Sequence, residues 1–177
     1  ILEIGCGWGG FSSFLAKKYS ANVTAITISK KQYEKAKQKI YDDKLTDKVD
    51  VKLLDYRNIN GKYDKIVSIE MFEAVGEKYW SKYFDVLKKN LKSDGSIGLQ
   101  TITIEDKFFQ KYKKFPDFIQ TYIFPGGMLP SVEEMDKVIT SKGLHITNKT
   151  MFGNDYAKTI RIWSESFENS WGCIKSL

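Results

Sequence analysis

Short apolar stretches alternate with longer polar segments in the first part of the chain. Stretches rich in β-branched residues predict strands, and segments with an apolar residue at every third or fourth position predict helices. The expected strands are residues 1–4, Asn22–Ile28, Val49–Leu53, Lys65–Ile69 and Ser96–Ile104; the expected helices are residues 9–19, Lys30–Asp42 and Glu77–Leu91, the last ending near a Ser-Asp-Gly turn at 93–95. This order predicts an α/β fold with a mostly parallel sheet, helices on both faces, and ligands at the carboxyl ends of the strands.

The regular alternation stops after Ile104. Residues 105–130 hold seven aromatic residues, three prolines and a Gly-Gly pair, a composition too rich in turns for a single helix. We expect an inserted aromatic lid there, whose side chains either complete the core or line a pocket. Beyond it the pattern predicts a helix at Glu133–Ser141, a strand at Leu144–Thr150 and a helix at Tyr156–Trp171.

The composition is typical of one folded domain, which we expect to cover residues 1–177. Hydrophobic residues make up 42% of the chain, and no stretch approaches the roughly 18 apolar residues of a membrane-spanning helix. The net charge of +6 comes from scattered lysines, with arginine only at Arg57 and Arg161. Nucleic-acid recognition usually recruits arginine clusters, so nucleic acid is not an expected partner. A diffuse positive charge suits either ordinary solvated helix faces or contact with an anionic membrane surface.

The cysteine and histidine content predicts no metal site. Cys6 and Cys173 lack the spacing of a zinc site or a disulfide framework, which favours a reducing, cytoplasmic location. Cys6 lies within a glycine cluster, where we expect it to pack as a small residue. The sole histidine, His145, is expected to face solvent.

The most informative motif is the glycine cluster that follows the first strand, in Ile-Leu-Glu-Ile-Gly-Cys-Gly-Trp-Gly-Gly at residues 1–10. Glycines allow a tight turn and a close approach of the backbone to a ligand, and the first amides of the following helix point into the same space. The cluster therefore predicts a site for a nucleoside-containing cofactor. Because its strand begins at Ile1, we expect the native chain to extend upstream, and the fold to be truncated at both ends.

The glycine spacing alone leaves two cofactor classes open. Gly5, Gly7 and Gly10 also satisfy the G-x-G-x-x-G pattern of dinucleotide-binding proteins, which need an acidic residue at the end of the second strand. That strand instead ends Ala-Ile-Thr-Ile-Ser. Two carboxylates, Glu3 before the first glycine and Asp55 after the third strand, favour S-adenosylmethionine, because Glu3 can meet its charged or hydroxyl groups and Asp55 its adenine amino group.

The chain resembles the cyclopropane-fatty-acyl-phospholipid synthase family of S-adenosylmethionine-dependent methyltransferases, which includes the mycolic acid cyclopropane synthases. The resemblance rests on Leu-Glu-Ile-Gly-Cys-Gly-Trp-Gly-Gly at 2–10, Thr-Ile-Ser-Lys-Lys-Gln at 27–32, Asp-Tyr-Arg at 55–57, Met-Phe-Glu-Ala-Val-Gly at 71–76 and Tyr-Ile-Phe-Pro-Gly-Gly-Met-Leu-Pro-Ser at 122–131. It implies a Rossmann-like class I methyltransferase fold. It also implies a bacterial lipid-biosynthetic enzyme whose substrate is an unsaturated phospholipid acyl chain at the inner membrane surface.

The resemblance assigns roles to individual residues. The residues implied to bind the cofactor are Glu3, Gly5, Gly7, Gly9, Thr27, Ile28, Ser29, Gln32, Asp55, Tyr56 and Ile69. Those implied to act in catalysis are Glu73, Gln100 and Ile102, which together correspond to groups that hold a bicarbonate ion in the family. If Glu73 has no catalytic role, its negative charge would only stabilise the start of a helix, where the backbone amides carry partial positive charge.

The implied reaction is attack of an acyl-chain alkene on the sulfonium methyl group, followed by loss of a proton to close a cyclopropane. Aromatic rings such as Tyr122 and Phe124 are candidates to stabilise the intermediate cation. The chain departs from well-known members by carrying Gln100 where they have histidine, and glutamine cannot take up a proton. The product is therefore either a cyclopropane or a methyl- or methylene-branched chain.

Two further hypotheses come from other classes of function. One is a methyltransferase of the same fold that acts on a soluble small molecule. The other is a module that binds the cofactor without turnover. The oligomeric state is left open by the sequence.

Overall fold

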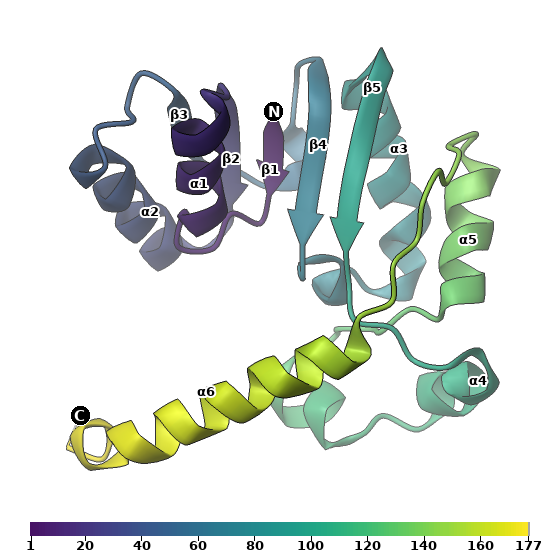
Figure 1. Cartoon of the computed structure of the whole chain (residues 1–177). Coiled ribbons are helices and arrows are strands. Elements are labelled where there is room, and N and C mark those ends of the chain that lie inside the picture. The colour runs from purple at the N-terminus through teal and green to yellow at the C-terminus, as the bar shows by residue number, and fades with distance from the viewer. Residues whose placement is uncertain (177) are drawn as a thin grey trace. The chain divides into compact units, whose positions relative to one another are not determined.

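Five parallel strands form one sheet in the order β3-β2-β1-β4-β5 (Figure 1). The computed structural model describes residues 1–176. The strands are β1 (Leu2–Ile4), β2 (Val23–Thr27), β3 (Val49–Leu53), β4 (Tyr63–Ile69) and β5 (Leu91–Gln100). The expected α/β fold with a parallel sheet is confirmed. Since the strands are parallel, all their carboxyl ends meet at one edge of the sheet.

Helices cover both faces of the sheet. On one face lie α1 (Gly10–Tyr19) and α2 (Lys30–Asp42), and on the other lies α3 (Trp80–Asn90), as Figure 1 shows. The alternation along β2 explains the two cores: Ala25 belongs to the apolar cluster under α1 and α2, and Ile26 to the cluster under α3. Side chains of successive strand residues point to opposite faces, so β2 contributes to both cores, whereas β1 and β4 contribute to the larger cluster and β3 to the smaller one.

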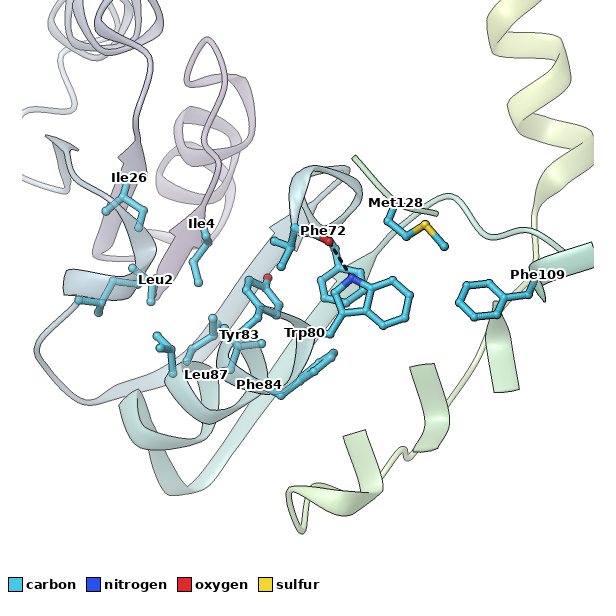
Figure 2. Packing of buried hydrophobic residues seen from close by; sticks show 14 residues of the cluster. Leu2, Ile4, Ile26, Phe72, Trp80, Tyr83, Phe84, Leu87, Phe109 and Met128 are labelled. Atoms are coloured by element: carbon cyan, nitrogen blue, oxygen red, sulfur yellow. Dashed lines mark hydrogen bonds between the residues drawn. The ribbon is translucent and has the colours of Figure 1, made fainter. Parts of the chain in front are cut away.

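The larger core is centred on Phe72, which follows β4 (Figure 2). Its ring centroid lies 5.5 Å from that of Trp80, 5.1 Å from that of Tyr83 and 5.5 Å from that of Phe84. The indole nitrogen of Trp80 donates a hydrogen bond of 2.7 Å to the carbonyl of Val75. Aromatic packing and this bond thus fix the backbone on both sides of Glu73.

The predicted lid is a sequence of short helical pieces. It contains α4 (Asp106–Lys114) and a π-helical turn (Ile119–Ile123), and leads to α5 (Val132–Ser141). The expectation that residues 105–130 do not form one helix is confirmed. Phe109 is buried in the large core beside Trp80, whereas Phe115 is 68% exposed.

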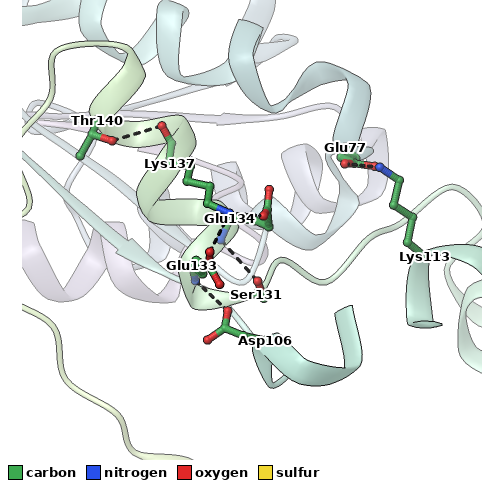
Figure 3. Close-up of polar contacts among 8 residues, drawn as sticks. All are labelled: Glu77, Asp106, Lys113, Ser131, Glu133, Glu134, Lys137 and Thr140. Atoms are coloured by element: carbon green, nitrogen blue, oxygen red, sulfur yellow. Dashed lines mark hydrogen bonds and ion pairs between the residues drawn. The ribbon is translucent and has the colours of Figure 1, made fainter. Parts of the chain in front are cut away.

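Polar contacts tie the lid to its surroundings (Figure 3). The backbone N–H of Glu133, at the start of α5, donates to the carboxylate of Asp106 on α4 over 2.8 Å. Lys113 of α4 forms an ion pair of 2.6 Å with Glu77, in the short helical turn before α3. Both ends of α4 are therefore attached to neighbouring elements.

Three details of the predicted elements are wrong. The Ser-Asp-Gly segment at 93–95 lies inside β5, where a register shift against β4 between Tyr63 and Lys65 accommodates the additional residues. Strand β5 ends at Gln100 and not at Ile104, which forms only an isolated bridge with Ser131. Residues 144–150 form no strand, because a strand needs a hydrogen-bonding neighbour and the described residues offer none there.

The chain divides into two compact units, Ile1–His145 and Ile146–Leu177. The second unit contains α6 (Gly153–Ile174), longer than the predicted helix, with Trp163, Phe167 and Trp171 exposed. The single domain expected from composition stays a prediction. Among the described residues, no helix combines the length and apolarity needed to cross a membrane. His145 is exposed, as expected.

Replacing Phe72 by alanine is expected to lower the free energy of unfolding by about 3–5 kcal/mol, because it empties the centre of the aromatic core. Chemical denaturation measures this change. The matched control is Phe115→Ala, which alters an exposed ring and should change the free energy by less than about 0.5 kcal/mol. Equal effects of the two substitutions would contradict the packing described here.

Candidate active site

The glycine loop is held against the centre of the sheet by its own backbone. The N–H groups of Gly5 and Cys6 both donate to the carbonyl of Ile26 in β2, over 3.0 and 2.9 Å. Gly5 has a left-handed φ of 81°, and a Cβ there would lie 2.8 Å from the Met71 side chain. Glycine is therefore required at this turn for both its conformation and the space beside it.

A pocket of about 370 Å³ lies at the carboxyl ends of β1, β2, β3 and β4. Six residues predicted to bind the cofactor line it: Gly5, Thr27, Ile28, Gln32, Asp55 and Tyr56. Its remaining lining, missed by the sequence analysis, includes Met71, Ala74, Val75 and Tyr79 after β4. A hollow of about 380 Å³ at the opposite edge contains none of the predicted site residues. Because parallel sheets bind ligands at their carboxyl edge, the first pocket is the candidate site.

The turn after β2 orients Gln32. The hydroxyl of Thr27 donates to the side-chain carbonyl of Gln32 over 2.9 Å and accepts from the N–H of Ser29 over 3.1 Å. The Ser29 hydroxyl accepts from the N–H of Gln32 over 3.3 Å and caps α2. Gln32 therefore has its amide nitrogen to offer to a ligand, and Ser29 supports this arrangement from outside the pocket lining.

Asp55 and Tyr56 form the wall after β3. Arg57 donates its backbone N–H and its guanidinium to Asp55, with the shortest bond 2.6 Å long. These side-chain hydrogen bonds hold the pKa of Asp55 below its usual value. Desolvation raises the pKa of Tyr56, whose ring packs edge-on against Tyr83. The wall thus presents an ionised carboxylate and a neutral phenol.

Glu3 lies under the glycine loop and outside the pocket lining. It is only 3% exposed, and its carboxylate accepts a hydrogen bond from the Ser12 hydroxyl of α1. Burial raises the pKa of Glu3 to about 7. Burial and the nearby Glu3 also raise the pKa of Cys6 to about 12, so this thiol is unreactive and packs within the smaller core, as expected.

A second group of predicted residues meets where β4 and β5 end. The carboxylate of Glu73 accepts the N–H of Ile102 over 2.6 Å, and its other oxygen, Oε2, is buried without a hydrogen-bond partner. The side-chain amide of Gln100 donates to Glu70 over 2.9 Å. Glu73 and Ile102 are thus in direct contact, whereas the side chain of Gln100 contacts Glu70, and none of these residues lines the pocket. Sequence analysis missed Glu70, which no motif singled out.

The other predicted residues occupy supporting positions. Gly7 and Gly9 have left-handed φ values of 52° and 80° in the loop, and Ile69 pairs with Gln100 at the end of β4. None of these three lines the pocket. Tyr122 and Phe124 are 72% and 66% exposed. Among the described residues, no cluster of acidic, cysteine or histidine side chains could hold a metal ion.

The comparison with protein families decides the relationship. The family model described as mycolic acid cyclopropane synthetase matches residues 1–177. The chain belongs to this family. The match covers the whole parallel sheet and the glycine loop.

Two relatives with different described activities are equally similar to this chain. A probable fatty acid methyltransferase of Pseudomonas putida is 37% identical over 172 residues, which cover 96% of this chain and 44% of the relative. The cyclopropane-fatty-acyl-phospholipid synthase of Escherichia coli K12 is 37% identical over 173 residues, covering 97% of this chain and 42% of the relative. The chain therefore spans less than half the length of these curated relatives.

A solved structure of the family has the same fold. The mycolic acid cyclopropane synthase CmaA1, complexed with SAH and CTAB, superimposes with a TM-score of 0.88 at 30% identity. The match covers 97% of this chain and 63% of CmaA1.

The Glu3→Gln substitution is expected to change how stability depends on pH. The folded-state pKa of Glu3 is raised from 4.5 to about 7, so its favourable contribution is complete below pH 4.5 and is lost as the pH rises through 7. Without cofactor, the variant should match the native protein near pH 4 and exceed its free energy of unfolding by about 3 kcal/mol at pH 8. Urea unfolding at both pH values, with Glu34→Gln as the exposed control, measures the difference. If the two proteins differed in free energy of unfolding by the same amount at both pH values, this would contradict the conclusion that the carboxyl group of Glu3 is buried and weakly acidic.

Proposed function

We propose that this protein transfers a methyl group from S-adenosylmethionine to the double bond of an unsaturated phospholipid acyl chain and closes a cyclopropane ring. The observation that carries the proposal is that residues lining the pocket and residues of the second group, at the ends of β4 and β5, are neighbours in the chain. Met71 and Ala74 line the cofactor-sized pocket, and between them in the chain lies Glu73, whose carboxylate binds the N–H of Ile102. A charged group thus lies next to the pocket, where a cation would form.

The pocket residues fit S-adenosylmethionine. Gly5 leaves room where a Cβ would collide with Met71, Gln32 offers an amide to a ribose, and Asp55 offers carboxylate oxygens to an adenine amino group. When bound, the cofactor supplies a methyl group on a positively charged sulfur. The chain's own contribution is to hold this group at the carboxyl edge of the sheet and to exclude water with the apolar walls after β4.

A bicarbonate ion is disfavoured at the groups that the resemblance assigns to it. The N–H of Ile102 already donates to Glu73, and one of the two N–H groups of the Gln100 amide donates to Glu70. The negative charge of these two carboxylates opposes the binding of a further anion. No step of the proposed reaction is derived through bicarbonate.

The lid supports a lipid substrate at a membrane surface. Phe115, Phe118, Tyr122 and Phe124 are all more than half exposed, and the last turn of α4 carries Lys111 and Lys114. Exposed aromatic side chains beside lysines suit the boundary between anionic headgroups and acyl chains. We propose that this surface contacts the inner face of the cytoplasmic membrane.

A second candidate product is a methyl- or methylene-branched acyl chain. Gln100 favours it, because an amide cannot take the methyl proton whose loss closes the ring, and the cation would then lose a different proton and form a double bond. The similarity to a probable fatty acid methyltransferase supports it as well. Both products arise from the same transfer and differ in the later fate of the cation.

Glu73→Gln is expected to reduce transfer of labelled methyl groups to unsaturated phospholipid vesicles by at least about 100-fold, because it removes a negative charge beside the forming cation. The affinity for S-adenosylhomocysteine should stay nearly unchanged, since Glu73 lies outside the pocket lining. The assay uses the protein expressed from its complete gene, with Glu105→Gln as the control substitution of an exposed carboxylate.

Each alternative to this proposal has its own outcome in the same assay. Vesicles of saturated phospholipid should accept no label. Retained transfer by Glu73→Gln would contradict the assigned role. Labelling of a polar acceptor but not of vesicles would indicate a soluble substrate, and binding without any turnover would indicate a binding module.

A further inference from the structure

Glu70 has an unusual backbone conformation at the end of β4. Its φ is 49°, in the left-handed region that non-glycine residues rarely adopt. This conformation costs about 1 kcal/mol, and residues that retain such strain often cluster at functional sites. Here the backbone N–H of Glu70 donates to the carbonyl of Gln100 over 2.9 Å, so the neighbouring strand stabilises the turn.

The side chain of Glu70 makes a second bond to the same residue. Its carboxylate accepts the amide of Gln100 over 2.9 Å. A carboxylate and a glutamine amide held by both backbone and side chain form a built arrangement across the ends of β4 and β5. Gln100 occupies the position where the resemblance expects a histidine. Glu70, which Gln100 holds by this hydrogen bond, therefore belongs to the same site.

We propose that the Glu70 carboxylate, oriented by Gln100, is the proton acceptor of the methyl transfer and replaces a bound bicarbonate ion. The inference rests on the proposed function. Glu70 is exposed, so a proton that it accepts can pass to water. Glu73 is committed through one oxygen to Ile102, and its other oxygen is buried, which suits it to stabilise positive charge.

The proposed step balances in atoms and electrons. A bond forms between the methyl carbon and one alkene carbon, and the electron pair of the broken carbon–sulfur bond stays on sulfur. The second alkene carbon is then a cation. A C–H bond of the transferred methyl group breaks, its electron pair closes the ring, and the proton goes to Glu70. No oxidant or reductant is needed.

The test compares Glu70→Gly and Glu70→Gln with the native protein, all expressed from the complete gene, in buffers freed of carbon dioxide. Glycine suits a left-handed φ, so Glu70→Gly should fold. Lys44→Gly is the matched control, since Lys44 has a φ of 57° and precedes β3 at the opposite, amino edge of the sheet. Methyl transfer to unsaturated phospholipid vesicles is measured with and without added bicarbonate.

We expect the native rate to be independent of bicarbonate and both Glu70 variants to lose about 100-fold or more without it. Added bicarbonate should restore at least a tenth of the native rate to Glu70→Gly, in which the Gln100 amide is released. Affinity for S-adenosylhomocysteine should not change. A native rate that requires bicarbonate, or full activity of Glu70→Gly without it, would overturn the inference.

A binding measurement separates this inference from the proposed function. Carbon-13 NMR of labelled bicarbonate should show no binding to the native protein with S-adenosylhomocysteine, and binding to Glu70→Gly. Bicarbonate binding to the native protein would overturn the inference whatever the lipid product. If no lipid is labelled and the native protein still excludes bicarbonate, the proposed function fails while the replacement of the anion by Glu70 stands.

Discussion

The position of β1 between β2 and β4 is the constraint on which the candidate site depends. Its residues pair with both neighbours in parallel, so the chain leaves the sheet at Gly5 with strand ends on either side. Two amides of the glycine loop then bind Ile26 of β2, and Gly5 leaves space for Met71 after β4. The pocket exists because these three strand ends meet at one edge. Its position follows from backbone pairing and needs few specialised side chains.

The ionisable groups at the ends of β4 and β5 are carboxylates, and the backbone around them holds them in place. Phe72 and its aromatic neighbours fix the segment that carries Glu73, while the pairing of β4 with β5 brings Glu70 to Gln100. Both carboxylates belong to residues next in the chain to Met71 and Ala74, which line the pocket, and fixed negative charge is most effective in a preorganised site. The same charges disfavour a bound anion. Stability and reactivity are thus linked through the short segment from Ile69 to Val75.

The sequence predicted the parts of the fold that local patterns determine. The alternation of β-branched and amphipathic segments predicted the sheet and its covering helices, and the resemblance named Glu73 and Ile102, which a hydrogen bond joins in the structure. It failed where structure depends on distant pairing: the Ser-Asp-Gly segment lies within β5, and residues 144–150 lack a strand partner. Glu70 was missed because its significance lies in a left-handed backbone and a contact with Gln100, neither of which is visible in a linear pattern.

The most direct test of methyl transfer to an acyl chain is mass spectrometry of phospholipids from cells that express the complete gene and receive methyl-labelled methionine. The account predicts unsaturated acyl chains that gain one labelled CH₂ unit. Resistance of that product to mild hydrogenation would identify a cyclopropane, and uptake of hydrogen would identify a methylene branch. Expression of the protein without any label in the acyl chains would contradict the central claim.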